Sequence, residues 1–242
     1  MKRKPWVLSC RKVSVSFDGF WALSEMDFTL HQNELQFLIG PNGAGKSTLL
    51  DVICGKVKPA GGAVLFQRGD GVTVNLTRMS EHAIAACGIG RKFQAPSVFA
   101  SLTVRENMEI ALKQKRGVFS VLFAKTGKED LDKIRSIMSM IGLASKADMK
   151  AGALSHGEKQ WLEIGMILLS EPQVLLLDEP VAGMTDEETE KTGLLLQEII
   201  KNRSVVVVEH DMDFVRQFSS RVTVMHGGTL LTEGTMAEVQ TN

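Results

Sequence analysis

Hydrophobic and polar residues alternate along residues 6–30, a spacing typical of half-buried antiparallel strands. The alternation is interrupted by the Asp-Gly pair at 18–19, where we expect a turn. A continuous apolar run at 35–40 leads into glycine-rich residues and predicts a buried strand followed by a helix from about Lys46. A second hairpin-like stretch spans 61–76. These patterns predict an N-terminal antiparallel β subdomain joined to a strand–loop–helix unit.

The hydrophobic period changes to that of a helix between residues 97 and 154. Two amphipathic segments, at 101–114 and 129–143, predict a helical subdomain. We therefore expect one domain over 1–242, in which 1–96 and 166–242 form the core and 97–165 the helical part.

Short apolar runs then alternate with helical segments. Strands are expected at 174–178 and 205–210, with a final strand at 222–225, and helices at 186–201 and 212–219. Such alternation predicts an α/β fold, in which a mixed or parallel sheet is covered on both faces.

Composition narrows the class of protein without fixing it. The chain has 242 residues, is 44% hydrophobic, and carries 28 basic and 28 acidic side chains. No basic excess suggests a nucleic-acid partner. We find no apolar run near the roughly 18 residues that a bilayer span needs. Cys10, Cys54 and Cys87 are widely spaced, so we expect reduced thiols without a metal role.

The sequence GPNGAGKST at 40–48 fits the phosphate-binding pattern G-x-x-x-x-G-K-[ST], after a predicted strand and before a predicted helix. Its glycines allow backbone N–H groups to face phosphate oxygens. Lys46 would contact the β- and γ-phosphates, and the Ser47 hydroxyl would bind Mg²⁺. The alternative is a glycine-rich turn with a solvated lysine. The candidate ATP-binding residues here are Gly40, Pro41, Asn42, Gly43, Ala44, Gly45, Lys46, Ser47 and Thr48.

Acidic residues follow the strand at 174–178. Asp178 would hold Mg²⁺, and Glu179 would activate a water in line with the γ-phosphate. His210 ends the next apolar run, so in a parallel sheet it belongs at the same edge. Gln94 could bond both the metal and the water. Lys46, Glu179 and His210 are thus the catalytic candidates, and Ser47, Gln94 and Asp178 the metal ligands; alone, each of these side chains has an ordinary structural explanation.

A second candidate anion site is LSHGEKQ at 154–160. Ser155 is a good helix N-cap, and Glu158 three residues later completes a capping box. The N-terminus of the helix, with the Gly157 backbone, could bind a phosphate.

Taken together, these motifs resemble the ATP-binding-cassette (ABC) family in order and spacing over nearly the entire chain. The resemblance implies an ATPase subunit of an importer, with an ABC-type P-loop fold and with ATP and Mg²⁺ bound. It also implies that Ser155, Gly157 and Glu158 face the nucleotide of a second ATPase subunit, either an identical or a related chain. The sequence lacks tyrosine, so Phe17 is the best match for the ring that stacks on adenine.

Three departures from the common pattern accompany the resemblance: His156 replaces a glycine, Glu158 replaces a glutamine, and the adenine-stacking tyrosine is missing. The segments LSHGEKQWLEIGM, DEPVAGMTDEET and VVEHDMDFV resemble the importer branch for branched-chain amino acids, amides and urea. FDGFWAL, GIGRKFQ and AGMTDEET are most similar to the subunits of urea importers.

An importer subunit implies further partners: integral membrane permeases, and indirectly a periplasmic or extracellular solute-binding protein. Phe99 and Leu102 are candidates for the permease contact, and packing in the core is the equal alternative for both. The chain would lie at the cytoplasmic face of the membrane. The alternatives are a branched-chain amino acid or amide importer, a soluble ABC ATPase acting on ribosomes or DNA, a P-loop small-molecule kinase, and a non-catalytic regulatory module.

Overall fold

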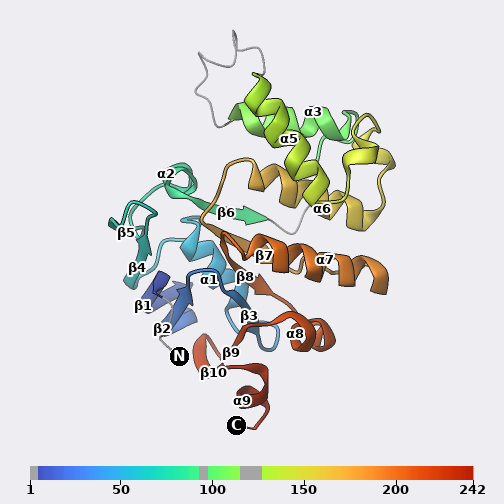
Figure 1. Cartoon of the computed structure of the whole chain (residues 1–242). Helices are drawn as coiled ribbons and strands as arrows, with labels where there is room; N and C mark the ends of the chain where they lie inside the picture. Colours follow the sequence, from blue (N-terminus) through green and yellow to red (C-terminus); the bar gives the residue numbers. More distant parts are fainter. Residues whose placement is uncertain (1–4, 93–97, 115–126, 242) are drawn as a thin grey trace. The chain divides into compact units, whose positions relative to one another are not determined.

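A computed structural model of the chain describes residues 5–92, 98–114 and 127–241. The described chain divides into two compact units (Figure 1). The first contains residues 5–91, 172–180 and 196–241, and the second contains the described residues of 92–171 and 181–195. The second unit takes in 166–171 and 181–195, which the sequence-based division assigned to the core.

The first unit begins with an antiparallel sheet in the order β2-β1-β4-β5. As predicted, β1 and β2 form a hairpin whose turn is Asp18-Gly19, and the second hairpin follows with a short outer strand. The strands are β1 (Trp6–Phe17), β2 (Phe20–His31), β4 (Gly61–Gln67) and β5 (Thr73–Asn75).

The other sheet has six strands in the order β10-β9-β3-β8-β7-β6. Strand β3 runs parallel to β8 and β9, β7 runs parallel to β8, and β10 is antiparallel to β9, so the sheet is mixed as expected. The strands are β3 (Leu35–Ile39), β6 (Ile89–Lys92), β7 (Val174–Asp178), β8 (Ser204–Val208), β9 (Arg221–His226) and β10 (Thr229–Gly234).

The central strands are buried on both faces, which explains their continuous apolar sequence. On one face Leu38, Leu176 and Val206 join a core that includes α1 (Lys46–Ile53) and the first sheet. On the other face Phe37 packs edge-on against Phe214 of α8 (Met212–Phe218), with ring centroids 5.7 Å apart.

Two expectations for the first unit were incomplete. The strand at 222–225 is not the last, because β10 and α9 (Met236–Gln240) follow it. We also did not predict α2 (Glu81–Cys87) or β6. All are short, and β10, α2 and α9 are largely exposed, so they have little hydrophobic periodicity to detect.

The second unit is helical, as predicted. It contains α3 (Val104–Gln114), α5 (Lys128–Met140), α6 (His156–Leu168) and the start of α7 (Asp186–Ile199). Gly165 lets α6 approach the end of α5 closely, because a Cβ there would lie 2.6 Å from the Ile141 side chain. Within the described residues, none of the helices is both long and apolar enough to cross a bilayer.

The α/β fold class is therefore confirmed: an N-terminal antiparallel β subdomain, a mixed sheet core and a helical subdomain. The parallel register also determines which strand ends lie side by side at one edge of this sheet. Asp178 pairs with Val208, and Leu38 pairs with the same residue from the other side. The carboxyl ends of β3, β7 and β8 therefore meet, which is where open α/β sheets place their ligand sites.

Candidate active site

The glycine-rich loop leaves the end of β3 and enters α1. Gly40, Gly43 and Gly45 all have positive φ angles, between 79° and 145°. A Cβ on Gly40 would lie 2.1 Å from the Met225 carbonyl oxygen, and one on Gly45 would lie 2.6 Å from that of Ala22. Both positions therefore require glycine for space as well as for conformation. The loop brings its backbone to the N-terminus of α1, an arrangement that suits an anion.

Lys46 is buried at the first position of α1. Its Nζ donates hydrogen bonds to the Gly40 and Pro41 carbonyl oxygens, at 2.8 Å and 3.0 Å. Burial lowers the pKa of the ammonium group, whereas the charges of Glu179 and Asp178 oppose the shift. The lysine thus holds its charge inside the loop, at the end of the sheet that carries these two carboxylates.

Asp178 is the last residue of β7 and is almost fully buried. Its Oδ1 has no hydrogen-bond partner among the described residues. Burial raises the pKa of the carboxyl group, and the Ser47 hydroxyl and Arg91 partly oppose this. A buried carboxylate oxygen without a partner, beside a serine hydroxyl, fits an oxygen-liganded cation such as Mg²⁺.

Arg91, at the end of β6, was missed by the sequence analysis. Its Nη2 lies 3.8 Å from Asp178 Oδ2, and its Nη1 lies 2.5 Å from Asp51 Oδ1 and 3.2 Å from Cys54 Sγ. The guanidinium group thus connects α1 to the carboxylate that ends β7. The only available signal was the segment GIGRKFQ, because β6 itself was not predicted.

Glu179 and His210 come together at the sheet edge. Glu179 has a φ of 49°, a conformation that non-glycine residues seldom adopt, and its N–H donates to the Val208 carbonyl oxygen at 2.9 Å. Its Oε1 lies 3.3 Å from His210 Nε2. We expected this strand to end at His210. Strand β8 ends two residues earlier, at Val208, so His210 lies in the loop beyond it.

Phe17 and Gln94 are the two remaining residues predicted for the nucleotide site, and the structure describes only Phe17. Phe17 ends β1 and is exposed, and the neighbouring Phe20 and Trp21 are exposed as well. The same hairpin contributes Ala22, whose carbonyl oxygen lies against Gly45. An exposed aromatic group therefore stands on the strand pair that packs against the glycine loop. Gln94 lies outside the described residues.

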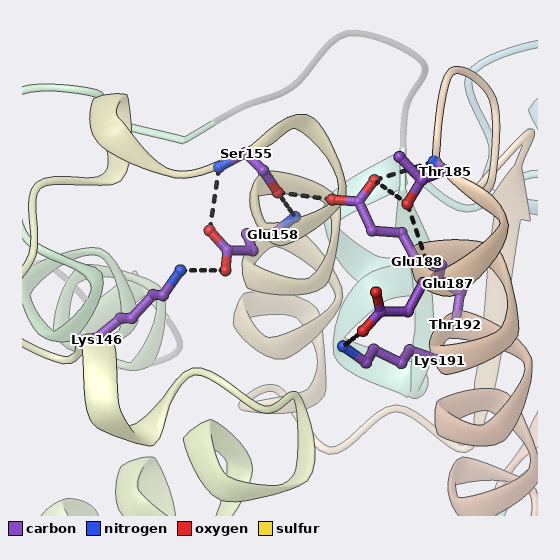
Figure 2. A network of polar contacts seen from close by, with 8 residues as sticks. All are labelled: Lys146, Ser155, Glu158, Thr185, Glu187, Glu188, Lys191 and Thr192. Carbon is purple, nitrogen blue, oxygen red and sulfur yellow. Dashed lines mark hydrogen bonds and ion pairs between the residues drawn. The ribbon is translucent and has the colours of Figure 1, made fainter.

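The second predicted anion site lies in the second unit. Ser155 is the N-cap of α6: its Oγ accepts the Glu158 N–H at 3.2 Å, and its N–H donates to Glu158 Oε2 at 3.1 Å, which confirms the capping box (Figure 2). Glu158 Oε1 forms an ion pair with Lys146. Both carboxylate oxygens of Glu158 are thus engaged within the chain.

Glu188 is the second residue that the sequence analysis missed. The Ser155 hydroxyl donates to Glu188 Oε1 at 2.8 Å. A Cβ on Gly157 would lie 2.6 Å from the Glu188 carboxyl carbon, so the glycine leaves room for this carboxylate on the first turn of α6. His156 is also engaged, because its Nε2 lies 3.1 Å from the Ala182 carbonyl oxygen.

A glycine-rich loop at the N-terminus of a helix, beside the acidic end of a neighbouring parallel strand, defines a P-loop nucleotide-binding fold. Residues 23–182 match the sequence model of the ABC transporter family. The chain belongs to this family, as an ATP-binding ATPase cassette coupled to transport.

Individual relatives agree with this assignment. The high-affinity branched-chain amino acid transport ATP-binding protein LivG of Escherichia coli is 34% identical over 98% of this chain and 94% of its own length. The ADP conformation of an ATP-binding cassette has a TM-score of 0.84 at 28% identity, covering 96% of this chain and 92% of its own. The dimeric structure of a bacterial ABC transporter cassette has a TM-score of 0.77 at 25% identity, covering 95% and 98%.

Proposed function

We propose that this chain is the ATP-hydrolysing subunit of a membrane importer for a small solute. The observation that carries the proposal is the arrangement at one edge of the sheet. There the glycine loop with Lys46 meets Asp178, Glu179 and His210. An ATP triphosphate in the loop would receive backbone N–H groups and one buried cation, and its γ-phosphate would face the acidic residues.

In this mechanism Glu179 acts as the general base. Its carboxylate takes a proton from a water whose oxygen attacks the γ-phosphorus, and the bond to the bridging oxygen of ADP breaks. His210, 3.3 Å from Glu179 Oε1, orients that carboxylate and contacts the γ-phosphate. Lys46 leaves the Gly40 and Pro41 carbonyl oxygens and binds the β- and γ-phosphates instead. The unusual φ of Glu179 is consistent with a functional position.

Mg²⁺ would be held by the Ser47 hydroxyl and the Asp178 carboxylate, with Gln94 as a further expected ligand. The described chain contains no group of three or more His, Cys, Asp or Glu side chains that could hold a metal by themselves. Mg²⁺ is usually bound through one or two carboxylates together with substrate phosphates and waters. When bound, the ion neutralises charge on the phosphates. Asp178 supplies the fixed negative charge on the protein side.

The helix N-terminus at Ser155 would serve a second copy of the cassette or a related chain. It would approach the γ-phosphate in the partner's glycine loop through the Ser155 hydroxyl, the Gly157 N–H and the helix dipole. The dimeric state of the similar bacterial cassette supports this arrangement. Loss of the γ-phosphate on hydrolysis would remove negative charge shared between the two chains, so that they separate.

The remaining partners follow from the importer proposal. Permease subunits would cross the membrane and contact the helical unit, for which the exposed Phe99 is a candidate. Its neighbour Leu102 is only partly exposed. A solute-binding protein would act on the opposite side of the membrane, and this chain would lie at the cytoplasmic face.

Two classes of solute are proposed. The similarity to a branched-chain amino acid transport protein favours leucine, isoleucine and valine. The segments FDGFWAL, GIGRKFQ and AGMTDEET favour urea or a short amide. Because the solute would pass through the permeases, no side chain of this cassette is expected to select it.

The test is ATP turnover of the complex purified with its permeases and reconstituted in lipid vesicles. We expect Mg-ATP hydrolysis that rises when a solute-binding protein is loaded with the correct solute, with urea, acetamide, leucine, isoleucine and valine compared separately. Lys46→Ala is the matched inactive control, and it should fail to bind ATP. Turnover unaffected by every membrane partner and solute would contradict the importer function, and release of phosphate only to an added acceptor would indicate a kinase instead.

A further inference from the structure

The proposed function leaves one contact of the Ser155 site unexplained. Glu188 places a carboxylate on the same helix N-terminus that is proposed to bind the partner's γ-phosphate. An acidic residue is an unexpected neighbour for a triphosphate, because two anions would then share one set of donors.

The Ser155 hydroxyl has a single proton, and Glu188 accepts it. Oγ receives the Glu158 N–H at 3.2 Å and donates to Glu188 Oε1 at 2.8 Å, so its donor capacity is used (Figure 2). To donate to a phosphate oxygen, Ser155 must first break its bond to Glu188.

Glu188 is itself held by the helix that carries it. Its Oε2 accepts the Thr185 N–H at 3.1 Å, and its own N–H donates to Thr185 Oγ1 at 3.3 Å, which is the capping box of α7. One carboxylate therefore joins the N-termini of two helices. The hydrogen bond from the Ser155 hydroxyl, and after it the one from the Thr185 N–H, hold the pKa of the Glu188 carboxyl below its ordinary value. The group is therefore ionised at neutral pH.

The pairing of these helices is also fixed in their interior. Trp161 Nε1 of α6 donates to the buried Thr192 Oγ1 of α7 at 2.8 Å, and Thr192 Oγ1 also donates to the Glu188 carbonyl oxygen. Glu188 is therefore presented to Ser155 by a packed helix pair. The basic side chains around this site have other partners: Lys146 pairs with Glu158, Lys191 pairs with Glu187 at 2.6 Å, and His156 Nε2 lies 3.1 Å from the Ala182 carbonyl oxygen. The charge of His156 nevertheless acts on the Glu188 carboxyl and favours its ionised form.

We propose that Glu188 occupies the Ser155 site as an intramolecular anion that the partner's nucleotide must displace, so that it sets the ATP concentration at which two cassettes associate. This inference rests on the proposed dimer. Displacement frees one carboxylate oxygen while Thr185 still holds the other. The cost of breaking the hydrogen bond between Ser155 and Glu188 and the repulsion between Glu188 and the triphosphate both oppose the association of two cassettes. Association then requires a bound triphosphate, and the weaker charge left after hydrolysis allows the contact to re-form.

The test compares two substitutions one residue apart, both in a Glu179→Gln background that is expected to slow hydrolysis. Glu188→Gln removes the charge but keeps an oxygen that can accept from Thr185 and Ser155. Glu187→Gln removes an equal charge from the same turn, without a contact to Ser155. The ATP concentration for half-maximal dimerisation is measured by analytical ultracentrifugation with Mg-ATP, and thermal unfolding checks that each variant is folded.

We expect Glu188→Gln to lower this ATP concentration roughly three- to ten-fold, whereas Glu187→Gln leaves it nearly unchanged. Dimers that form at the same ATP concentration in both variants, or that need more ATP with Glu188→Gln, would overturn the role of Glu188 while leaving the proposed function intact. If the Glu179→Gln protein forms no ATP-dependent dimer, alone or with a related chain, the proposed dimer is wrong, and this inference fails with it.

Discussion

Glu179 and His210 face each other beyond the carboxyl ends of the parallel strands β7 and β8, with Glu179 Oε1 3.3 Å from His210 Nε2. They belong to segments 31 residues apart in sequence, and the pairing of β7 with β8 brings them together. The Glu179 N–H is hydrogen-bonded to the end of β8. A carboxylate and an imidazole in this relationship can orient each other and handle one proton, as a general base and its positioning partner do.

Replacing Glu179 by glutamine should therefore reduce ATP turnover by roughly 10²–10⁴-fold, because the amide cannot accept the proton of the attacking water. Glutamine keeps the size of the side chain, so ATP affinity should change little. Turnover is measured by phosphate release, and affinity by titration with a fluorescent ATP analogue. Glu187→Gln, an equal change on the exposed surface of α7, should leave both values unchanged; turnover retained by Glu179→Gln would remove this residue from its proposed role.

His210→Ala tests whether the pair acts as a unit. Alone, it should lower turnover by roughly 10²-fold. In the double variant with Glu179→Gln, turnover should fall no more than about three-fold below that of Glu179→Gln alone, because groups that serve one step are strongly non-additive. The four proteins of this cycle are compared under saturating Mg-ATP. Effects that simply multiply would mean that the two side chains act independently despite their contact.

Much of the site was predictable because local chemistry dictates it. The glycine loop needs positive φ angles and close backbone approach, which only glycine supplies at Gly40 and Gly45. The Ser155 capping box needs four consecutive residues and nothing else. The placement of His210 at the same edge as Asp178 followed from two apolar strands, because parallel neighbours end at one edge of a sheet.

The missed residues depend on contacts that no local pattern encodes. Arg91 reaches Asp51, 40 residues away, from a strand too short to show a period. Glu188 reaches Ser155 across 33 residues, and in sequence it is simply one acidic residue among several at the start of a helix. Long-range pairing of polar side chains requires the packed helices and sheet to be known first.

The three cysteines differ in burial, and this difference predicts how readily their thiols react. Burial, with a smaller contribution from Asp27, raises the pKa of Cys10 to about 12, so at pH 8 only about one thiol in 10⁴ is ionised. Cys54 is also buried, whereas Cys87 is partly exposed. Iodoacetamide at pH 8 should therefore modify Cys87 first and Cys10 last, as followed by peptide mass spectrometry. Protein unfolded in urea is the control and should react at all three; rapid modification of native Cys10 would contradict its burial.

The ionised Asp178 carboxylate should lower the stability of the nucleotide-free protein. Burial raises the pKa of its carboxyl group above the ordinary value, despite Ser47 and Arg91. An acid with a raised folded-state pKa binds protons more readily in the folded protein. Its contribution therefore becomes unfavourable as the pH rises from the unfolded-state value of about 3.9 through the folded-state value, and the cost persists at neutral pH.

Asp178→Asn removes this ionisation, and Arg91 keeps Asp51 as an ion-pair partner. At pH 7.5, without Mg²⁺ and nucleotide, we expect Tm to rise by roughly 2–4 °C, the effect of about 1 kcal/mol in a domain of this size. The gain should shrink as the pH falls, because the raised pKa lets the native Asp178 carboxyl bind a proton before an ordinary carboxyl does, and Mg-ATP hydrolysis should be lost at every pH. The control is Asp132→Asn, which breaks an exposed pair with Arg135 and should leave Tm nearly unchanged. A lower Tm for Asp178→Asn would show that the carboxylate stabilises the empty site, contrary to the direction that its burial imposes.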